Sequence, residues 1–243
     1  MPIAKMLSGG VNKPNEMAKK FRVSLGDTLR RFGIDYLYYV TLVDNVPSIL
    51  AGGILSYNKV KKVPHLSMAN QGVQDLRDRI IPGINKPLHD FVPLFFATHT
   101  PMQYKLVFGN KYSGGEVEPR DFVIIKLNAP AVFKLPKVIF TDGNAATKKT
   151  AFYSNLSDLN KLDWHIIHHK KCWGDYYKWK KSAEVLVYGK VPFGCFKQII
   201  VCCDEAKENL IRMARAYAKE NNTSTHLSNI DVEVDKDLWY YNY

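Results

Sequence analysis

The sequence predicts an α+β protein built around a mixed β-sheet. Its strand-like segments are short and rich in β-branched and aromatic residues. They alternate with helical segments, but without the regular rhythm of a parallel α/β protein. A chain of 243 residues, of which 46% are hydrophobic, fills one core and does not require a second. We therefore expect a single domain over residues 35–243, preceded by a polar, basic arm and helix over residues 1–34.

The expected strands have the composition that suits a pleated, half-buried surface. In chain order they are Tyr36–Leu42, Val92–Phe96, Phe122–Leu127, Val138–Thr141, Ala183–Val187, Gln198–Cys203 and Ile230–Val234. Cys202 and Cys203 end one of these strands, where alternation turns neighbouring side chains to opposite faces. Four cysteines in a chain of this length do not form a disulfide scaffold, so we expect reduced thiols in a cytoplasmic protein.

The expected helices are marked by capping residues and by apolar faces. They are Ser24–Phe32, Asn45–Leu50, Gln71–Arg79, Leu156–Trp164 and Asp204–Lys219. Ser24 or Asp27 can cap the first, and Gly52 with Gly53 ends the second, as glycine commonly does. Around the third helix, residues 56–88 are long, polar and irregular, and such a loop in a compact domain is more often functional than idle.

The chain is strongly basic, which bears on its partners. Lys and Arg number 34 against 23 Asp and Glu, so the formal net charge is +11 and the isoelectric point is about 9.3. This charge favours polyanions such as nucleic acid, an anionic membrane or a nucleotide, although it can also serve solubility alone. No apolar run approaches a membrane span of about 18 residues, and the N-terminus has no apolar signal-peptide core.

One acidic residue, Glu184, lies inside the apolar strand AEVLV. Burying a carboxylate is costly, so acids are uncommon in such strands. Two interpretations remain open for Glu184. It lies at an exposed edge of an alternating strand, or it is a functional carboxylate held rigidly by the sheet.

The segment that precedes this strand interleaves basic and aromatic residues from His165 to Lys181. Cations follow a phosphate backbone while aromatic rings stack on unpaired bases, so the composition suits single-stranded nucleic acid. The alternative is a basic loop whose aromatic rings pack on the core. We expect no metal site in its HIIHHKKC run, because four side chains on one helical stripe cannot surround an ion and the adjacent lysines repel it.

The chain contains neither a P-loop nor a GxGxxG turn before a helix, so any dinucleotide is bound without a Rossmann fingerprint. Five segments instead resemble, in order, one family. They are TLVDNVPSIL (41–50), NQGVQDLR (70–77), LHDFVPLFFATHTPMQY (88–104), FTDGNAATKKTAFYSNLSDLNKLDW (140–164) and SAEVLVYGKVP (182–192). The chain thereby resembles DarT, the DNA ADP-ribosyltransferase toxins of bacterial DarT–DarG toxin–antitoxin systems. The resemblance extends from about residue 36 to residue 203 and implies a split, mixed sheet with flanking helices and an NAD cleft.

The resemblance also implies roles for individual residues. The catalytic glutamate of the family falls on Glu184, and its essential arginine falls on Arg77, with Arg79 as a close competitor. Many members open the NAD site with H-x-T, which here becomes Tyr39-Val40-Thr41, so Tyr39 replaces the histidine. The implied NAD contacts are Tyr39, Thr41, Asn45, Arg77 and Phe95. Substrate recognition falls on residues 148–181, where the implied DNA contacts are Tyr153, Lys170, Lys171, Trp173 and Trp179.

The expected function is the transfer of one ADP-ribose from NAD to a base of single-stranded DNA, with thymine favoured and nicotinamide released. NAD is then a co-substrate and is not recycled, and no metal is needed. The resemblance further implies a DarG-like macrodomain antitoxin as partner. The lack of a long apolar run predicts no membrane association. The alternatives are transfer to guanine, RNA or protein, a non-enzymatic single-strand binding protein, and, more distantly, a metal nuclease that uses the histidine cluster.

Overall fold

The computed structural model describes residues 24–62, 65–66, 71–109, 111–112, 115–116, 118–170 and 174–238. An eight-stranded sheet runs through the domain in the order β12-β11-β6-β1-β3-β9-β7-β8. Its strands are β1 (Tyr36–Leu42), β3 (Phe91–Phe95), β6 (Phe122–Asn128), β7 (Val138–Thr141), β8 (Phe152–Tyr153), β9 (Glu184–Tyr188), β11 (Phe196–Val201) and β12 (Asp231–Val234). β11 and β12 are parallel, whereas the other neighbours are antiparallel, so the predicted mixed sheet is confirmed.

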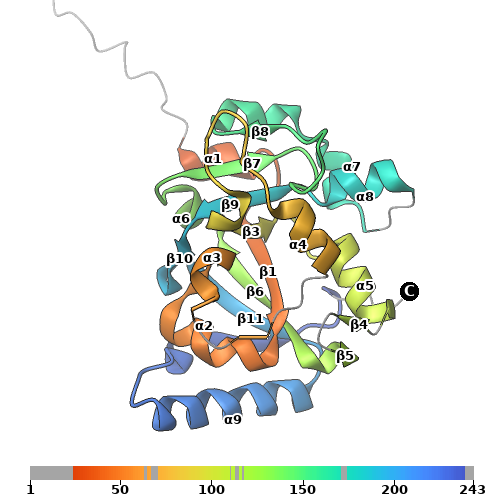
Figure 1. Ribbon diagram of the computed structural model, residues 1–243. Helices are drawn as coiled ribbons and strands as arrows, with labels where there is room; N and C mark the ends of the chain where they lie inside the picture. The colour runs from red at the N-terminus through yellow and green to blue at the C-terminus, as the bar shows by residue number, and fades with distance from the viewer. Residues whose placement is uncertain are drawn as a thin grey trace, which may run out of the picture.

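The sheet consists of two halves joined at a narrow point. β1 pairs along its whole length with β6, but it pairs with β3 only where Tyr38 lies opposite Phe95. The half β12-β11-β6-β1 therefore diverges from the half β3-β9-β7-β8, and Figure 1 shows the second half above the first. This is the split sheet that the family resemblance implies.

Two small pairs of strands lie outside the main sheet. They are β2 (Ile54–Leu55) with β10 (Lys190–Val191), and β4 (Lys111–Tyr112) with β5 (Gly115–Glu116). The helices are α1 (Leu25–Arg30), α2 (Val46–Gly52), α3 (Tyr57–Val60), α4 (Gln71–Arg77), α5 (Pro101–Gly109), α6 (Ala129–Phe133), α7 (Trp164–His168), α8 (Asp175–Lys181) and α9 (Asp204–Glu220). Short 3-10 helices are η1 (Val43–Asn45), η2 (Leu88–Asp90), η3 (Pro119–Asp121), η4 (Leu156–Lys161), η5 (Phe193–Cys195) and η6 (Leu227–Asn229).

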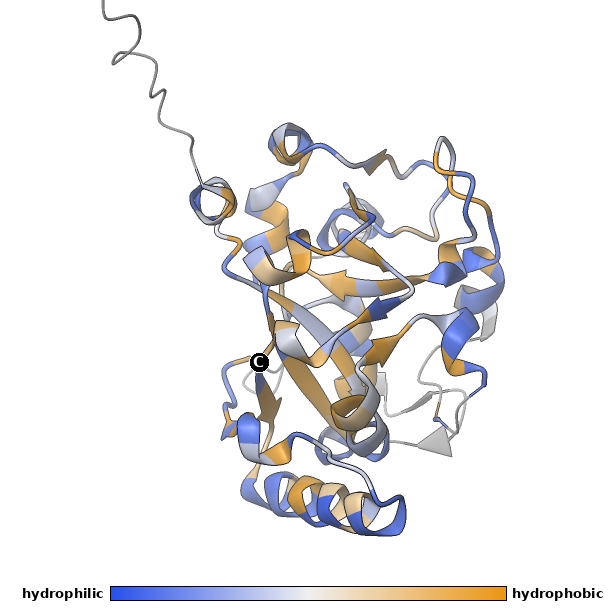
Figure 2. Cartoon of the chain, turned by 90° about the vertical axis from the view of Figure 1, so that its left-hand side faces the viewer, coloured by the Kyte–Doolittle hydropathy of each residue, from blue (hydrophilic) through white to orange (hydrophobic). Residues whose placement is uncertain are grey.

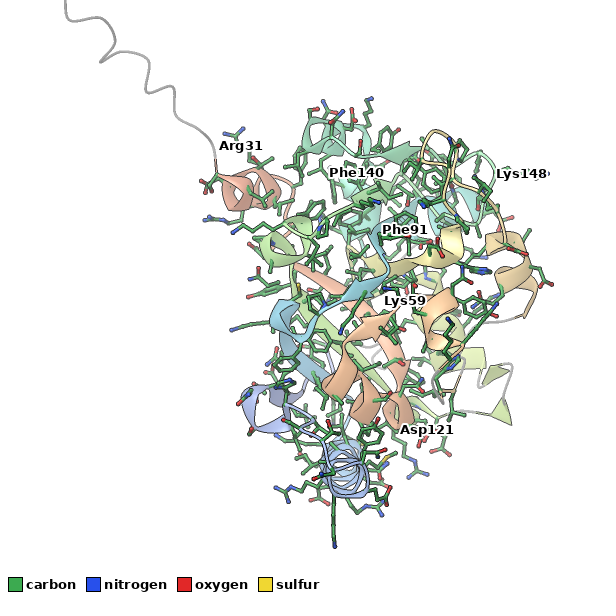
Figure 3. The ribbon with its side chains drawn as sticks, turned by 60° about the vertical axis from the view of Figure 1, so that its left-hand side comes forward. Arg31, Lys59, Phe91, Asp121, Phe140 and Lys148 are labelled. Carbon is green, nitrogen blue, oxygen red and sulfur yellow. The ribbon has the colours of Figure 1, made fainter. Side chains whose placement is uncertain are left out.

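The core lies between the sheet and its covering helices. α9 buries Leu210 and Ala214 against the domain and contacts α2, as its amphipathic sequence predicts. Figure 2 shows the hydrophobic colouring of the central strands inside this layer. In Figure 3, Phe91 and Phe140 lie within the upper half of the sheet, whereas the exposed Lys148 lies at the margin of the molecule, in the loop after β7.

Helix α1 is packed as part of the domain. Ser24 caps it by accepting a hydrogen bond from the Asp27 N–H at 3.1 Å, and α1 contacts α6. Leu29 and Ile34 are fully buried in the main core. The boundary that we expected at residue 34 thus falls within packed structure, because the apolar face of α1 is covered. Residues 1–23 of the expected arm lie outside the described part of the chain.

The expected helix Leu156–Trp164 is wrong in type and extent. The chain forms the 3-10 helix η4, and Asp163 then begins the separate helix α7 by accepting a hydrogen bond from the Ile166 N–H at 3.1 Å. Helix α7 ends at His168, and His169 has an extended backbone. The histidines of HIIHHKKC therefore do not form one continuous helical stripe, and Cys172 lies outside the described residues.

Strand β11 ends earlier than its apolar run suggests. We expected Gln198–Cys203, but pairing with β6 and β12 begins at Phe196 and ends by Val201. Cys203 lies at the N-terminal cap of α9, so the two cysteines form the turn between strand and helix. Among the residues that the structure describes, no helix combines the length and apolar character needed to cross a bilayer.

Candidate active site

Glu184 is the first residue of β9 and is buried, with 2% of its surface exposed. Its backbone N–H donates to Thr141 Oγ1 at 2.9 Å, and the Thr141 hydroxyl donates to the Gly143 carbonyl at 2.7 Å. Glu184 lies opposite Phe95 on β3, which itself lies opposite Tyr38 on β1. Opposed residues of antiparallel strands share a face, so these three side chains meet at the junction of the two half-sheets.

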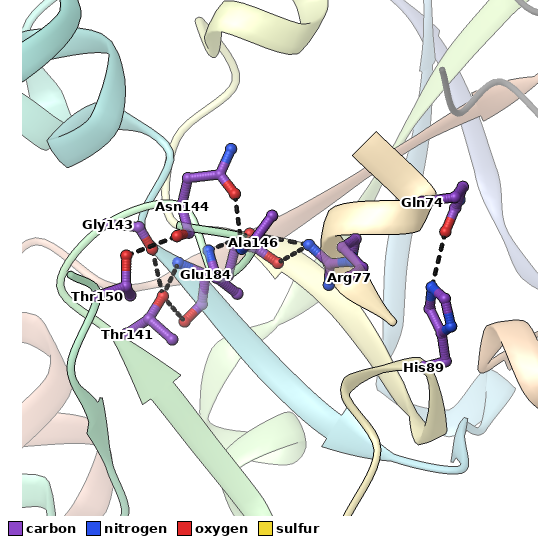
Figure 4. A network of polar contacts seen from close by, with 10 residues as sticks. Gln74, Arg77, His89, Thr141, Gly143, Asn144, Ala146, Thr150 and Glu184 are labelled. Carbon is purple, nitrogen blue, oxygen red and sulfur yellow. Dashed lines mark hydrogen bonds and ion pairs between the residues drawn. The ribbon is translucent and has the colours of Figure 1, made fainter. Parts of the chain in front are cut away.

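The Glu184 carboxylate is compensated by one cation and one backbone amide (Figure 4). Arg77 Nη1 donates to both oxygens, at 3.0 Å to Oε2 and 3.2 Å to Oε1. The Ala145 N–H donates to Oε1 at 2.9 Å. A buried carboxylate is tolerated when charge and hydrogen bonds compensate it in this way. The exposed-edge interpretation of Glu184 is therefore wrong, because its carboxylate is buried and hydrogen-bonded.

The Arg77 guanidinium has a further hydrogen-bond donor beside those that bind Glu184. Arg77 is the last residue of α4, and its side chain is 12% exposed. Its Nη2 atom is buried and has no hydrogen-bond partner among the residues that the structure describes. Leaving a buried guanidinium nitrogen unpaired is costly. An oxygen acceptor placed beside the Glu184 carboxylate would satisfy it, and a phosphate, a ribose hydroxyl or a base carbonyl each supplies one.

Arg79, the competing arginine, lies elsewhere. Its Nη1 donates to the Thr147 carbonyl at 3.3 Å, and its guanidinium lies 5.5 Å from the centre of the Phe152 ring. The structure thus brings Arg77 to Glu184 and uses Arg79 to hold the loop that follows β7. The sequence alone could not separate two arginines that stand two positions apart.

The loop over residues 141–151 presents Ala145 to Glu184 and is extensively hydrogen-bonded. Asp142 accepts from the Ala151 N–H at 3.0 Å and from Lys180 Nζ at 3.4 Å. The Asn144 carbonyl accepts from Thr150 Oγ1 at 2.6 Å. Thr141 and Ala145 were not among our predicted site residues, because a threonine and an alanine in a loop carry no pattern that marks them.

Trp179, a predicted DNA contact, supports this loop. Its indole N–H donates to Thr150 Oγ1 at 2.7 Å, and its backbone carbonyl accepts from the Asn144 N–H at 3.0 Å. A Cβ atom on Gly143 would lie only 2.3 Å from Trp179 Nε1, so glycine is required where the ring crosses the loop. Lys149 Nζ lies 4.0 Å from the ring centre. The Trp179 ring therefore packs against this loop.

The remaining predicted DNA contacts differ in their surroundings. Tyr153 on β8 is half-buried, with its ring 5.7 Å from that of Phe140, and desolvation is the main cause that raises its pKa. Lys170 is exposed. Lys171 and Trp173 lie outside the described residues. On the following helix α8, the rings of Tyr176 and Tyr177 are 53% and 47% exposed and lie 5.7 Å apart.

The predicted NAD contacts on β1 lie near the junction but alternate away from Tyr38. Burial raises the pKa of Tyr39 to about 12, so its hydroxyl is neutral at physiological pH. Thr41 Oγ1 accepts from Asn45 Nδ2 at 3.2 Å. The Asn45 side chain also binds both backbone groups of Leu66, at 2.8 and 2.9 Å, and so ties residues 65–66 to the end of β1.

Within the described ranges, no group of three or more His, Cys, Asp or Glu side chains is arranged to hold a metal ion. Of the three histidines in the basic stretch, His168 bonds to the Phe32 carbonyl at 2.8 Å and stacks on Trp164. This histidine joins α7 to the turn after α1, which is a structural task.

The chain is similar to known proteins of one family. A family model described as ssDNA thymidine ADP-ribosyltransferase, DarT, matches residues 38–241. A DNA ADP-ribosyl transferase of Thermus sp. (strain 2.9) is 29% identical over 212 residues, covering 84% of this chain and 95% of the relative. A DNA ADP-ribosyl transferase–DNA ADP-ribosyl glycohydrolase fusion protein of Thermosipho africanus is 29% identical over 178 residues, covering 72% of this chain and 44% of the fusion.

Solved structures show the same likeness in three dimensions. Thermus sp. 2.9 DarT in complex with ADP-ribosylated ssDNA has a TM-score of 0.72 at 27% identity, covering 85% of this chain and 97% of that chain. The same protein in complex with NAD+ has a TM-score of 0.68 at 26% identity, covering 86% and 98%. The α+β fold expected from the resemblance is thereby confirmed. Since the family model spans most of the sequence and the site residues fall within it, the chain belongs to the DarT family of single-stranded DNA thymidine ADP-ribosyltransferases.

Proposed function

We propose that Glu184 and Arg77 are the catalytic pair of this NAD-dependent DNA ADP-ribosyltransferase, and that thymine in single-stranded DNA is its acceptor. One observation carries the proposal. A buried carboxylate at the junction of the half-sheets is bound by the Arg77 guanidinium and by the Ala145 N–H. Beside it lies an Arg77 nitrogen that has no partner in the described part of the chain. A buried polar group without a partner calls for an explanation, and a ligand or reacting group that binds there supplies one.

In the proposed reaction, the bond between nicotinamide and the ribose C1′ atom breaks, and nicotinamide leaves with the bonding electrons. Positive charge then develops on the sugar, where the fixed carboxylate of Glu184 stabilises it. A ring nitrogen of the base forms the new bond to C1′, and its proton passes to Glu184 as general base. Arg77 Nη2 binds an oxygen of NAD or of the base and holds it against the carboxylate. The DNA is single-stranded because the base edge must be reachable.

The proposed NAD contacts are those implied by the family resemblance. Phe95 lies opposite Glu184 on the neighbouring strand and so borders the same space. The predicted contacts Tyr39, Thr41 and Asn45 lie on and just after β1, beyond its single pairing with β3. Asn45 already fixes the backbone of Leu66, so part of its proposed task is to hold residues 65–66 at the site.

The proposed DNA surface is the basic and aromatic region that leads into β9. Tyr153, Lys170, Lys171, Trp173 and Trp179 remain its proposed members, and the exposed rings of Tyr176 and Tyr177 join them. Exposed aromatic rings can stack on bases while neighbouring lysines, such as the exposed Lys178, bind phosphates. The formal net charge of +11 supports a polyanionic substrate.

The biological role follows from the family. We propose that the chain is a cytoplasmic toxin controlled by a DarG-like macrodomain antitoxin. The Thermosipho africanus relative combines a DNA ADP-ribosyl transferase with a DNA ADP-ribosyl glycohydrolase in one protein, and this supports a partner that removes the modification. Nothing in the proposed chemistry requires a membrane.

The acceptor is tested with the purified chain, NAD and a mixed-sequence single-stranded oligonucleotide, whose products are weighed by mass spectrometry. The proposal predicts an adduct of one ADP-ribose that fragmentation assigns to thymine. Guanine oligonucleotides, RNA and protein are offered together with labelled NAD as competitors. Label on guanine, RNA or protein would correct the acceptor. Intact NAD beside unmodified DNA would contradict the proposed reaction and favour a single-strand binding protein.

A further inference from the structure

Helix α4 delivers Arg77 to Glu184, although the helix itself is short and largely exposed. Asp75 and Leu76 face solvent, and Leu76 is 60% exposed. Among the α4 side chains that the structure describes, buried apolar surface therefore contributes little to holding the helix in place. A guanidinium must be positioned within a fraction of an ångström to act on a reacting centre, so the position of α4 needs another source of precision.

Gln74 supplies a second contact between α4 and the domain. It precedes Arg77 by three positions, and residues at this spacing lie on the same face of a helix. Gln74 Oε1 lies 3.0 Å from His89 Nε2. An amide oxygen only accepts hydrogen bonds, so His89 donates through Nε2. Figure 4 shows two contacts of α4, that of Gln74 with His89 and that of Arg77 with Glu184.

His89 is a fixed point for this contact. It is 7% exposed, and its ring centre lies 4.4 Å from that of Tyr57 on α3. Its neighbour Asp90 accepts from the Gly189 N–H at 2.7 Å and from Asn58 Nδ2 at 2.8 Å. These bonds tie η2 to α3 and to the turn that follows β9. The His89 ring is therefore held at a fixed position relative to β9, the strand that carries Glu184.

A hairpin returns the chain from α4 to His89. The Leu88 N–H donates to the Arg79 carbonyl at 2.9 Å, and Ile80 bridges to Pro87. Ile81 and Leu88 are fully buried in a small hydrophobic cluster that also contains Phe91, Ile139 and Leu186. The two partners, Gln74 and His89, are thus joined by a short, anchored segment that brings them face to face.

The charge state of His89 agrees with this geometry. Desolvation lowers its pKa, and the nearby Arg77 guanidinium and Lys61 ammonium lower it further, against the opposing effect of Asp78 and Asp90. The ring is therefore neutral at physiological pH. Its Nδ1 atom lies 3.9 Å from Asp78 Oδ1, a carboxylate that is 82% exposed. Because the His89 ring is neutral, it does not compete with Arg77 as a cation for the Glu184 carboxylate.

We infer that Gln74 and His89 are positioning residues, which hold α4 so that Arg77 reaches Glu184 in the geometry needed for transfer. The inference rests on the proposed catalytic role of Arg77 and deepens it. It assigns a function to Gln74 of the QDLR segment and to His89 of the HDFV segment. Neither side chain takes part in the proposed reaction itself.

The test is a double-mutant cycle between Gln74 and Arg77, followed by kcat and KM for NAD on an oligonucleotide. Gln74→Leu removes the acceptor at nearly the same volume, and we expect kcat to fall about 10- to 100-fold, the range for a displaced catalytic group, with KM for NAD little changed. Gln74→Glu retains an acceptor and should restore kcat to within about threefold of the native value, since it preserves the hydrogen bond.

In the Arg77→Lys background, Gln74→Leu should reduce kcat by no more than about twofold, because residues that act through one another are not additive. Gln198→Leu is the matched control, since Gln198 lies on β11 and bonds to Asp231 and Glu233 on β12. Near-ultraviolet circular dichroism and thermal unfolding verify that each variant folds.

Three outcomes would overturn the inference. An unchanged kcat in Gln74→Leu beside an impaired Arg77→Lys contradicts the positioning role alone. An equal loss from Gln74→Leu in both backgrounds shows that Gln74 acts by another route. An unimpaired Arg77→Lys contradicts the proposed role of Arg77 itself, on which the positioning depends.

Discussion

At the scale of single residues, the two arginines make different contacts and should respond differently to replacement. Arg77 donates to both oxygens of Glu184, whereas Arg79 bonds to the Thr147 carbonyl. Arg77→Lys keeps the charge but loses the planar fork, so we expect transfer to fall by about 10²-fold or more. Arg79→Lys should retain most activity. Initial rates on one oligonucleotide compare them, and an active Arg77→Lys beside an inactive Arg79→Lys would reverse the assignment.

Tyr39 gives a second prediction at this scale. If its hydroxyl binds NAD as proposed, Tyr39→Phe should raise KM for NAD about tenfold, the value of one hydrogen bond, while kcat changes little. The thermal unfolding midpoint of the variant controls for packing, since the ring is retained. An unchanged KM would mean that Tyr39 serves only the core between the half-sheets.

Glu184 could be predicted from its sequence because an acid inside an apolar strand is conspicuous, and the resemblance added its role. The choice between Arg77 and Arg79 required the structure, because only the helix end at Arg77 decides which side chain faces the sheet. The hydrogen bond from the Ala145 amide could not be predicted from the sequence, because every residue except proline has a backbone N–H and the side chain does not show which one will donate.

At the scale of elements, the loop over residues 141–151 acts as a rigid support for Glu184. Gly143→Ala would place a Cβ atom 2.3 Å from Trp179 Nε1, so the ring or the loop must move. We expect the transfer rate to fall about 10²-fold, as for a displaced active-site group. Gly52→Ala is the matched control, because a Cβ atom there meets nothing within 4 Å. Normal transfer by Gly143→Ala would contradict the supporting role of this loop.

The predicted helices and strands match the structure where the apolar pattern of the sequence agrees with the packing. They differ from it where a side chain caps a new helix inside an expected one. The strands Tyr36–Leu42 and Val138–Thr141 match in their bounds. The helix expected over Leu156–Trp164 is divided because Asp163 caps a new helix inside it. Pairing with β6 and β12 also places the end of β11 at Val201, ahead of the apolar cysteines.

At the scale of the whole molecule, the core extends beyond the segment that resembles the family. Leu29 on α1 is fully buried, although α1 precedes the matched residues 38–241. Leu29→Ala should lower the free energy of unfolding by about 2–5 kcal/mol, as for other buried leucines. Leu76→Ala, at a side chain that is 60% exposed, should change it by less than about 0.5 kcal/mol. Equal, small effects in urea titrations would show that α1 is only loosely attached.

The α+β class could be predicted from the pattern of strands and helices in the sequence. The split of the sheet could not be predicted from that pattern. The separation depends on β1 meeting β3 at the single pair Tyr38–Phe95, a long-range contact that no local pattern encodes. It was expected only through family resemblance. The same junction brings Phe95 and Glu184 together from segments far apart in the chain.

The most direct test of the central claim replaces Glu184 by glutamine, which keeps the shape and removes the charge. ADP-ribose transfer from NAD to a thymine-containing single-stranded oligonucleotide is measured by mass spectrometry, with Glu233→Gln on β12 as the matched control. We predict that a folded Glu184→Gln protein loses transfer by about 10²- to 10⁴-fold, as expected on removal of a catalytic acid–base group, while the control retains it. Native transfer rates in a folded Glu184→Gln protein would contradict the assignment of Glu184 as the catalytic carboxylate.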